Sequence, residues 1–145
     1  MILLDTSVLV YAVGSDHPLQ SRCRALIAAI GDGRVSATTT VEVLQEFAHV
    51  RARRRGRQDA AELTERFAAL LAPLVPLEAE DLERGMEVFR RHESLGAFDA
   101  VLAATAMRRE HITGLVSADR AFADVARLRH LDPASSDFDA ELGIR

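Results

Sequence analysis

Short apolar segments alternate with helical patterns along this chain, and that alternation restricts its fold more than any other feature. Strands that alternate with helices pair in parallel, and the helices cover both faces of their sheet. The order therefore predicts an α/β fold with a central parallel sheet. The segments predicted to be strands are Met1–Asp5, Arg34–Ala37, Gly114–Ala118 and Leu128–Leu131.

Apolar periodicity, capping residues and Gly or Pro stops predict the helices between these strands. Thr6 or Ser7 is expected to cap the first helix, and Leu74–Leu77 fits either a short strand or a turn. The predicted helices are Thr6–Val13, Pro18–Ile30, Val41–Arg55, Gln58–Ala72, Glu78–Ser94, Ala97–Glu110 and Phe122–Val125. We expect one domain over residues 1–145, with positions 132–145 as a less ordered tail, because this length suffices for one core.

The composition excludes several classes of function. All 18 basic residues are arginine, and without lysine there is no P-loop nucleotide site, Schiff-base chemistry or phosphoaspartyl site of the response-regulator kind. The single cysteine, Cys23, excludes an intramolecular disulfide and a Cys-based zinc site. The net charge of −4 argues against a protein that coats nucleic acid through positive charge. No apolar run approaches a bilayer span and no signal peptide is evident, so we expect a cytoplasmic protein with no membrane segment.

Two carboxylates follow predicted strands directly. Asp5 ends the first strand, and Asp119 follows the apolar run Leu115–Ala118. The carboxyl ends of parallel strands line the ligand crevice of an open α/β sheet, so both side chains are expected at one edge. The alternative is that each aspartate only caps the helix that follows it.

Asp99 lies in a helical segment, Ala97–Met107, that is apolar on nearly every side. An unpaired carboxylate buried there would cost several kcal/mol. The helix dipole offsets only about 0.3–1 kcal/mol in the first turn, so a cationic partner is implied. The sequence leaves open whether that partner is an arginine or a metal ion.

Glu42 lies one turn into a helix that Thr38–Thr40 can cap. It shares a polar helix face with Gln45, Glu46, His49 and Arg53, and this face is either solvated or directed at the sheet edge that carries Asp5 and Asp119. Four converging carboxylates without lysine or cysteine are typical of a site for hard divalent cations, Mg²⁺ or Mn²⁺. The residues thus predict a metal-dependent phosphodiesterase or phosphatase.

At these residues the sequence resembles the PIN-domain ribonucleases, especially the VapC toxins of bacterial toxin–antitoxin pairs. The resemblance covers essentially the whole chain, and it implies a three-layer α/β/α sandwich around a central parallel sheet. It also implies an acidic quartet that binds Mg²⁺ or Mn²⁺, formed here by Asp5, Glu42, Asp99 and Asp119. The matching segments, in family order, are Leu3–Leu9, Thr40–Val43, Ala97–Ala100 and Val116–Asp119 followed by Phe122.

The resemblance implies hydrolysis of an RNA phosphodiester by metal-activated water, leaving a 5′-phosphate and a 3′-hydroxyl. Asp5 and Asp99 would ligate the metal with help from Asp119, and Glu42 would position or deprotonate the attacking water. Thr6 and Ser117 either hold water or phosphate oxygens near the metal or are simple caps.

A dense arginine cluster follows the Glu42 face, at the end of the predicted helix Val41–Arg55. It is either a solvated helix end, which the helix dipole favours, or a patch that tracks RNA phosphates. Its members are Arg51, Arg53, Arg54, Arg55 and Arg57.

The resemblance also implies partners: a small antitoxin protein, an RNA substrate and a second copy of the chain in a homodimer. We expect the antitoxin to place an arginine against Asp5, Asp99 or Asp119 and apolar side chains beside the helix Val41–Arg55. Two alternatives stay open, a PIN nuclease of RNA processing without an antitoxin and a non-catalytic PIN-like module that binds RNA or protein. The presence of all four acids argues against the second.

Overall fold

The centre of the molecule is a four-stranded, fully parallel sheet with strand order β2-β1-β3-β4. A computed structural model describes residues 1–144, and Arg145, the last residue of the predicted tail, lies outside the described residues. The central pair aligns Ile2 with Gly114 and Leu4 with Val116, so both strands end at the same edge. The strands are β1 (Ile2–Leu4), β2 (Ala37–Thr38), β3 (Gly114–Val116) and β4 (His130–Leu131).

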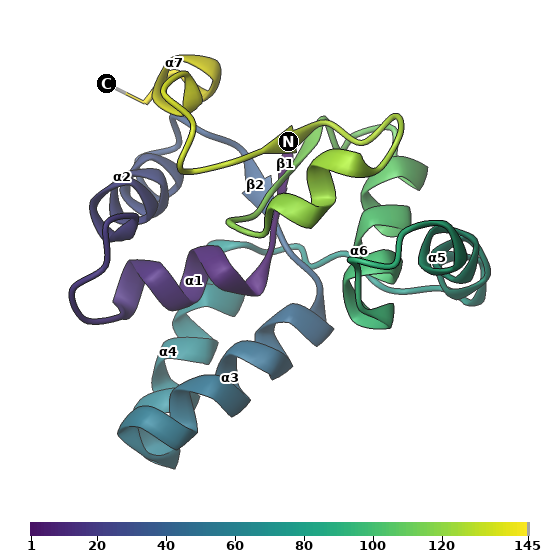
Figure 1. Cartoon of the computed structure of the whole chain (residues 1–145). Coiled ribbons are helices and arrows are strands. Elements are labelled where there is room, and N and C mark those ends of the chain that lie inside the picture. The colour runs from purple at the N-terminus through teal and green to yellow at the C-terminus, as the bar shows by residue number, and fades with distance from the viewer. Residues whose placement is uncertain (145) are drawn as a thin grey trace.

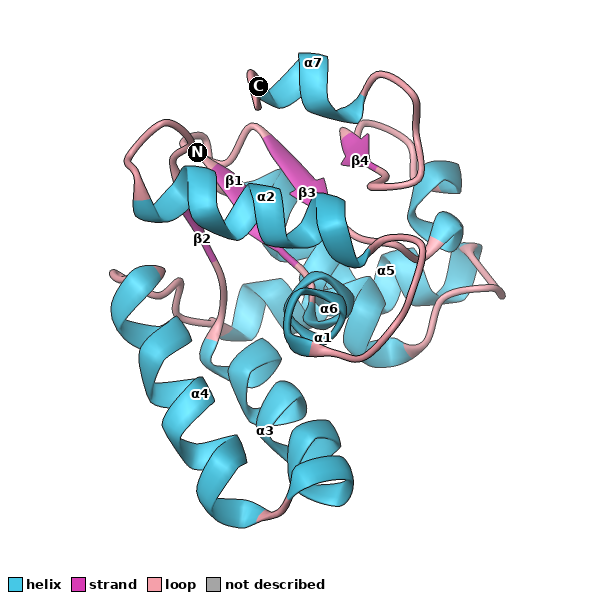
Figure 2. Cartoon of the chain, turned by 90° about the vertical axis from the view of Figure 1, so that its left-hand side faces the viewer, coloured by secondary structure: helices cyan, strands magenta, loops and turns pink. Residues whose placement is uncertain are grey.

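Helices cover both faces of this sheet, as the predicted sandwich requires. Figure 1 shows the sheet between α2 on one side and α6 with α5 on the other, and Figure 2 shows the α3–α4 pair extending away from the sheet. The helices are α1 (Thr6–Val13), α2 (Gln20–Gly31), α3 (Val41–Arg55), α4 (Arg57–Leu70), α5 (Ala79–Arg91), α6 (Ala97–Arg108), the 3₁₀ helix η1 (Arg120–Asp124) and α7 (Phe138–Leu142). No helix among residues 1–144 is long and apolar enough to cross a membrane.

The central strands are short and are buried on both faces. Every residue of β1 and β3 is buried, and Leu3, Leu4, Leu115 and Val116 have no exposed surface. Such strands carry apolar side chains on both faces instead of an alternating pattern. Because the strands end at Leu4 and Val116, the residues that follow them lie at the edge of the core. Asp5 directly follows β1, and Asp119 follows β3 three residues later.

The two helix pairs are held by different contacts. In α3–α4, the rings of Phe47 and Phe67 meet edge to face with centroids 5.2 Å apart. In α5–α6, a Cβ on Gly85 would lie 2.7 Å from the Cα of Val101, so only glycine permits this approach. This close crossing fixes α6, whose first turn carries Asp99.

The structure differs from the sequence predictions at several places. Strand β2 occupies Ala37–Thr38 instead of Arg34–Ala37. Within Leu74–Leu77, which fitted either a short strand or a turn, Val75 forms an isolated parallel bridge with Thr40. The cap of α1 is Asp5, not Thr6 or Ser7. The stretch predicted as a less ordered tail contains α7, because Phe138 and Ile144 supply apolar side chains that bury 99% and 93% of their surface in the core.

Candidate active site

The sheet topology brings Asp5 and the segment after β3 together. The N–H of Asp5 donates to the carbonyl of Val116 at 3.0 Å, which continues the parallel pairing one residue past each strand. Asp5 is 6% exposed and Ser117 is fully buried beside it. The sheet edge predicted from the two strand ends therefore exists, and Ser117 is part of it.

One oxygen of Asp5 is saturated with hydrogen bonds. Its Oδ2 accepts from the hydroxyls of Ser7 and Ser117, both at 2.7 Å, and from the N–H of Ser7 at 3.4 Å. Within residues 1–144 no hydrogen bond reaches Oδ1. Oδ2 therefore caps α1, as the alternative interpretation of Asp5 predicted, while Oδ1 makes no hydrogen bond within the described residues.

Ser7 and Ser117 form a small hydroxyl network that the sequence predicted only in part. Ser7 Oγ also accepts from the N–H of Ala118 at 3.1 Å, and Ser117 Oγ accepts from the N–H of Asp119 at 3.0 Å. The network ties the start of α1 to the segment that carries Asp119. Ser7 was missed because a hydroxyl in the first turn of a helix is ordinarily a local cap.

Asp99 lies at the start of α6 and faces other carboxylates instead of an arginine. Its pKa is raised to about 7, chiefly by burial and then by the nearby charges of Asp5, Asp119 and Glu46. Among residues 1–144 its side chain makes no hydrogen bond or ion pair. The arginine alternative for Asp99 is therefore absent from the described structure, and its surroundings are those of an acid that lacks a cation.

The replacement of Asp99 by asparagine is expected to stabilise the metal-free protein above neutral pH. The folded pKa of about 7 lies above the unfolded value of 3.8, so the contribution of Asp99 to stability is most favourable below pH 4 and is lost as the pH rises toward 7. Discounted for solvent contact, the gain for Asp99→Asn is about 1–2 kcal/mol, or roughly 3–6 °C in Tm.

Thermal melts of both proteins from pH 4 to pH 8 in EDTA measure this difference. Asp124→Asn, which neutralises an exposed carboxylate on η1, serves as the matched control and should leave Tm unchanged. A destabilised Asp99→Asn would mean that the carboxylate has a cationic partner within the chain.

Glu42 lies in the first turn of α3, whose cap is the Thr40 hydroxyl accepting from the N–H of Val43 at 3.2 Å. Its Oε2 is buried and has no hydrogen-bond partner among the described residues. A buried acceptor without a donor is unusual, since such groups are nearly always satisfied. This oxygen is therefore available to a water molecule or a ligand.

Glu46, one turn further along α3, also belongs to the acidic group. Its Oε2 accepts from the hydroxyl of Thr6 at 2.5 Å, and its charge acts on Asp99. The sequence placed Glu46 on the same helix face as Glu42 but gave it no role. The i, i+4 spacing from Glu42 was the available signal.

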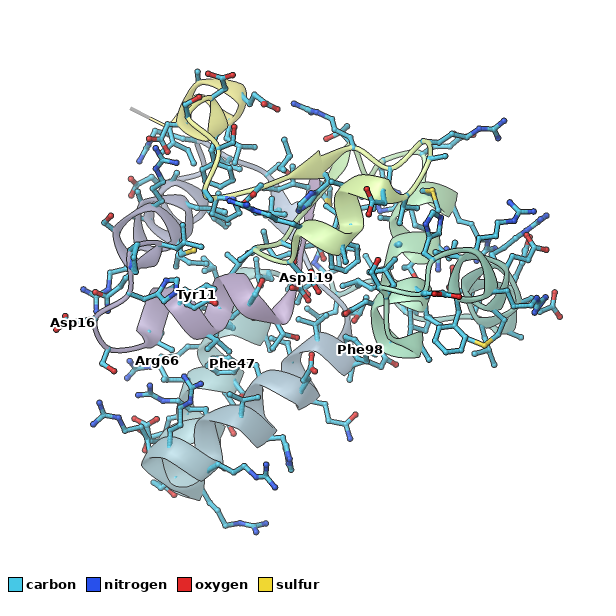
Figure 3. The ribbon with its side chains drawn as sticks, viewed as in Figure 1. Tyr11, Asp16, Phe47, Arg66, Phe98 and Asp119 are labelled. Atoms are coloured by element: carbon cyan, nitrogen blue, oxygen red, sulfur yellow. The ribbon has the colours of Figure 1, made fainter. Side chains whose placement is uncertain are left out.

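Asp119 is exposed and sits at the start of η1, where its Oδ1 accepts from the N–H of Ala121 at 2.9 Å. Figure 3 shows Asp119 where β1 passes into α1, with Phe98 at the start of α6 below it. Its charge reaches Asp99. Asp119 therefore caps η1, as the helix-capping alternative predicted, and it also lies close enough to Asp99 for its charge to act on that carboxylate.

The donor set fits a hard divalent cation, although the ligands are not arranged as a closed cage. All donors are carboxylate or hydroxyl oxygens, which Mg²⁺ and Mn²⁺ prefer. Among residues 1–144, no three His, Cys, Asp or Glu side chains are grouped so that they could hold a metal ion together. Mg²⁺ commonly keeps several waters and binds through one or two carboxylates plus substrate phosphate, and the free oxygens of Asp5 and Asp99 suit that mode.

The arginine cluster divides into structural and free members. Arg51 is paired with Asp59 and donates to the carbonyl of Val13 at 3.1 Å, so it joins α3, α4 and α1. Arg53, Arg54 and Arg55 are exposed, and the last two line a cavity of about 320 Å³ between α1 and α3. This cavity lies beside the helix Val41–Arg55, where the sequence predicted apolar contacts with an antitoxin.

A different buried carboxylate, Asp81, belongs to the fold and not to the acidic group. It has no exposed surface, and it contacts the guanidinium groups of Arg108 at 2.5 Å and Arg109 at 2.7 Å. Burial alone would raise its pKa. Hydrogen bonds from Arg109, the N–H of Glu78 and Arg108 outweigh that effect, so its pKa is lowered.

Comparison with known proteins agrees with this arrangement. The family model described as the PIN domain matches residues 2–128. Ribonuclease VapC7 of Mycobacterium tuberculosis is 48% identical over the full length of both chains. Ribonuclease VapC23 of the same species is 33% identical over 88% of this chain and 99% of its own, and Ribonuclease VapC13 is 29% identical over 90% and 99%.

A parallel sheet with acidic side chains at its carboxyl edge, together with these matches, defines the class. The chain belongs to the PIN-domain family, and within it to the VapC type.

Proposed function

We propose that this protein is a Mg²⁺-dependent endoribonuclease, also able to use Mn²⁺, that acts in the cytoplasm as the toxin of a type II toxin–antitoxin pair. One observation carries the catalytic part: Asp99 lies among Asp5, Asp119 and Glu46 without a cationic partner in the described chain, and its pKa is raised to about 7. A divalent cation would offset this repulsion. The relatives named ribonucleases support RNA as the substrate.

In this proposal each acid has a separate task. Oδ1 of Asp5 and the carboxylate of Asp99 hold the cation, with Asp119 contributing directly or through water. Bound Mg²⁺ supplies positive charge at the scissile phosphate. Glu42 accepts a proton from the attacking water at its unpartnered Oε2, and the in-line displacement leaves a 5′-phosphate and a 3′-hydroxyl.

Ser7, Ser117 and Thr6 act as positioning residues. The two serine hydroxyls fix Oδ2 of Asp5, which leaves Oδ1 directed at the ligand. Thr6 fixes Glu46 in the same way. The role proposed here for Thr6 and Ser117 is thus to hold carboxylates, whereas the sequence suggested that they hold water or phosphate oxygens, and Ser7 joins them in this role.

RNA approach requires positive charge near an acidic centre. Arg53, Arg54 and Arg55 are exposed at the end of α3, about three turns from Glu42. They are suited to hold RNA phosphates, whereas the pairing of Arg51 with Asp59 gives Arg51 a structural role first.

Inhibition by an antitoxin follows from the same charge pattern. A guanidinium binds carboxylates in a bidentate fork, so an antitoxin arginine would occupy the place of the cation beside Asp5, Asp99 or Asp119. The cavity between α1 and α3, lined in part by Val10, Val13 and Phe47, can take apolar side chains of the same segment.

Co-expression with the product of the adjacent small gene tests this inhibition. Tight binding and loss of RNase activity are expected, with activity restored when the inserted arginine is replaced by glutamine. Inhibition that survives the replacement would contradict the proposed charge contact.

Homodimerisation is supported by an apolar face beside Glu42. Val41 and Leu82 are more than half exposed, at 56% and 55%, and Phe98 is 38% exposed. Leu82 and Phe98 line a cavity of about 260 Å³ that Glu42 also lines. A second copy placed on this face would bury them in a symmetric interface.

Sequencing of RNA ends after induced expression tests the function. Wild-type protein should create recurrent new ends that carry a 5′-phosphate, and Asp5→Ala should create none. New ends with a 5′-hydroxyl would instead indicate attack by the ribose 2′-hydroxyl and contradict the water mechanism.

A further inference from the structure

A basic cavity of about 560 Å³ lies between α5, α6 and the segment that follows η1. Positive side chains outnumber negative ones in its wall, which combines four arginines and a histidine with a single carboxylate. These residues are Arg84, Arg91, His92, Arg108, Arg127 and Glu87. In a protein with a net charge of −4, such a local excess of positive charge indicates an anion as the ligand.

Some of these cations are already paired, and others are free. Arg108 is engaged with Glu80 and Asp81, and Arg84 lies 3.5 Å from Glu87. The side chains of Arg91, His92 and Arg127 form no hydrogen bond or ion pair within residues 1–144. Two permanent charges and an imidazole therefore remain for a ligand.

The backbone at Arg127 is also unusual. Its φ of +67° is the one positive φ of a non-glycine residue in the described chain. Apart from glycine and asparagine, residues adopt this left-handed conformation only at a cost in conformational free energy. This unfavourable conformation occurs at Arg127, whose side chain lines the cavity.

The cavity is connected to the acidic group through two elements. Helix α6 begins beside Asp99 and reaches the cavity at Ala104 and Met107, and η1 leads from Asp119 to Val125 and Arg127. At 1.5 Å per residue, Met107 lies about 12 Å along the helix axis from Asp99. A single RNA strand covers this distance within a few nucleotides.

We propose that this cavity binds a backbone phosphate of the RNA strand a few nucleotides from the scissile bond; the inference rests on the proposed ribonuclease function. Guanidinium forks match phosphate oxygens, and phosphate contacts fix the register of a nucleic acid without reading its sequence. Within the described residues no Phe, Tyr or Trp lines the cavity, so the wall suits a phosphate and offers little stacking surface for a base. Positive charge here offsets the repulsion between the acidic centre and the strand.

The test is the salt dependence of RNA binding by the full-length protein in EDTA, where cleavage is prevented. Fluorescence anisotropy of a labelled single-stranded RNA is measured from 50 to 300 mM NaCl for wild type and for the double variant Arg91→Gln/Arg127→Gln. The control variant Arg34→Gln/Arg66→Gln removes two exposed arginines on the α2–β2 connection and α4. Thermal melts establish that all three proteins are folded.

The double variant is expected to bind RNA roughly 10-fold more weakly than the control at low salt. Its slope of log K against log salt should be shallower by about 0.7, the contribution of the one phosphate contact that is lost. Equal slopes and affinities for the two double variants would overturn the inference while leaving the proposed function intact. Absence of RNA binding by the wild type would overturn the proposed function itself.

A competition arm separates RNA from free phosphate. Inorganic phosphate should displace RNA no better than chloride at matched ionic strength, because one small anion lacks the neighbouring contacts of a strand. The opposite result would be tight binding of inorganic phosphate that the Arg91→Gln/Arg127→Gln variant alone loses, while this variant still binds RNA like the wild type. In that case the site is one for free phosphate and the assignment to RNA is wrong.

Discussion

Asp5→Asn is expected to lower RNA cleavage by at least about 10³-fold without unfolding the protein. Asparagine keeps the size of the side chain and caps a helix as well as aspartate, so α1 should still begin at residue 6. The substitution removes the charge of the free Oδ1 and disturbs the hydrogen bonds that Ser7 and Ser117 donate to Oδ2. The measurement is the cleavage rate of a labelled RNA in Mg²⁺ by purified protein.

The matched control is Asp16→Asn. Asp16 is an exposed aspartate at the far end of α1 from Asp5, as Figure 3 shows. This variant should cleave RNA at the wild-type rate. If Asp5→Asn also retains the wild-type rate while folded, Asp5 does not hold the metal and the assignment of the acidic group is wrong.

Asp81→Ala is expected to lower the free energy of unfolding by about 3–5 kcal/mol, roughly 10 °C in Tm. Asp81 has no exposed surface, accepts from the N–H of Glu78 at 2.8 Å and holds both Arg108 and Arg109. Alanine leaves that N–H and two guanidinium groups without their shared acceptor, at the point where α5 meets the end of α6.

Chemical denaturation at pH 7 measures this loss, with Glu80→Ala as the control. Glu80 also contacts Arg108, at 2.6 Å, but its side chain is 55% exposed, so its removal should cost less than about 1 kcal/mol. Because the pKa of Asp81 is lowered in the fold, the stability that it provides is present at pH 7 and is lost as the pH falls below about 4. Equal effects of the two substitutions would show that burial does not distinguish these carboxylates.

The acidic group could be predicted from the sequence where local pattern and topology agree. Asp5 follows a run with no polar residue, and Asp99 interrupts an apolar helix, so each carboxylate stands out locally. Parallel pairing of β1 with β3 then places the segment after β3, including Ser117 and Asp119, next to Asp5. The rule about strand ends was enough for this step.

Contacts between distant segments could not be predicted in the same way. Asp81 reads as an ordinary residue in an acidic helix start, and nothing local to it indicates that Arg108 and Arg109, 27 and 28 residues later, would enclose it. Glu46 is exposed, and the hydrogen bond that fixes its carboxylate comes from Thr6, 40 residues earlier. The apolar periodicity of a sequence describes one helix at a time, whereas the roles of Asp81 and Glu46 arise from the packing of one helix against another.

The segment ends show the same limit. Strand β2 is two residues long, and its position depends on pairing of Ala37 and Thr38 with Ile2 and Leu3 more than on its own sequence. In the C-terminal stretch, small polar residues hid the buried Phe138 and Ile144. Burial of these two apolar side chains in the core is enough to hold the short helix α7 against the rest of the protein.

If a divalent cation held by Asp5 and Asp99 makes this fold a ribonuclease, as we propose, cleavage depends on that cation. Metal removal followed by titration measures this dependence. Purified wild-type protein is freed of metal with EDTA and dialysed, and RNA cleavage is then followed as Mg²⁺ or Mn²⁺ is added back. In parallel, calorimetry measures Mn²⁺ binding by the wild type and by Asp99→Asn. We expect no cleavage without metal, recovery with either ion, and weaker Mn²⁺ binding by Asp99→Asn. Undiminished cleavage in excess EDTA, or equal Mn²⁺ binding by the two proteins, would contradict this proposal.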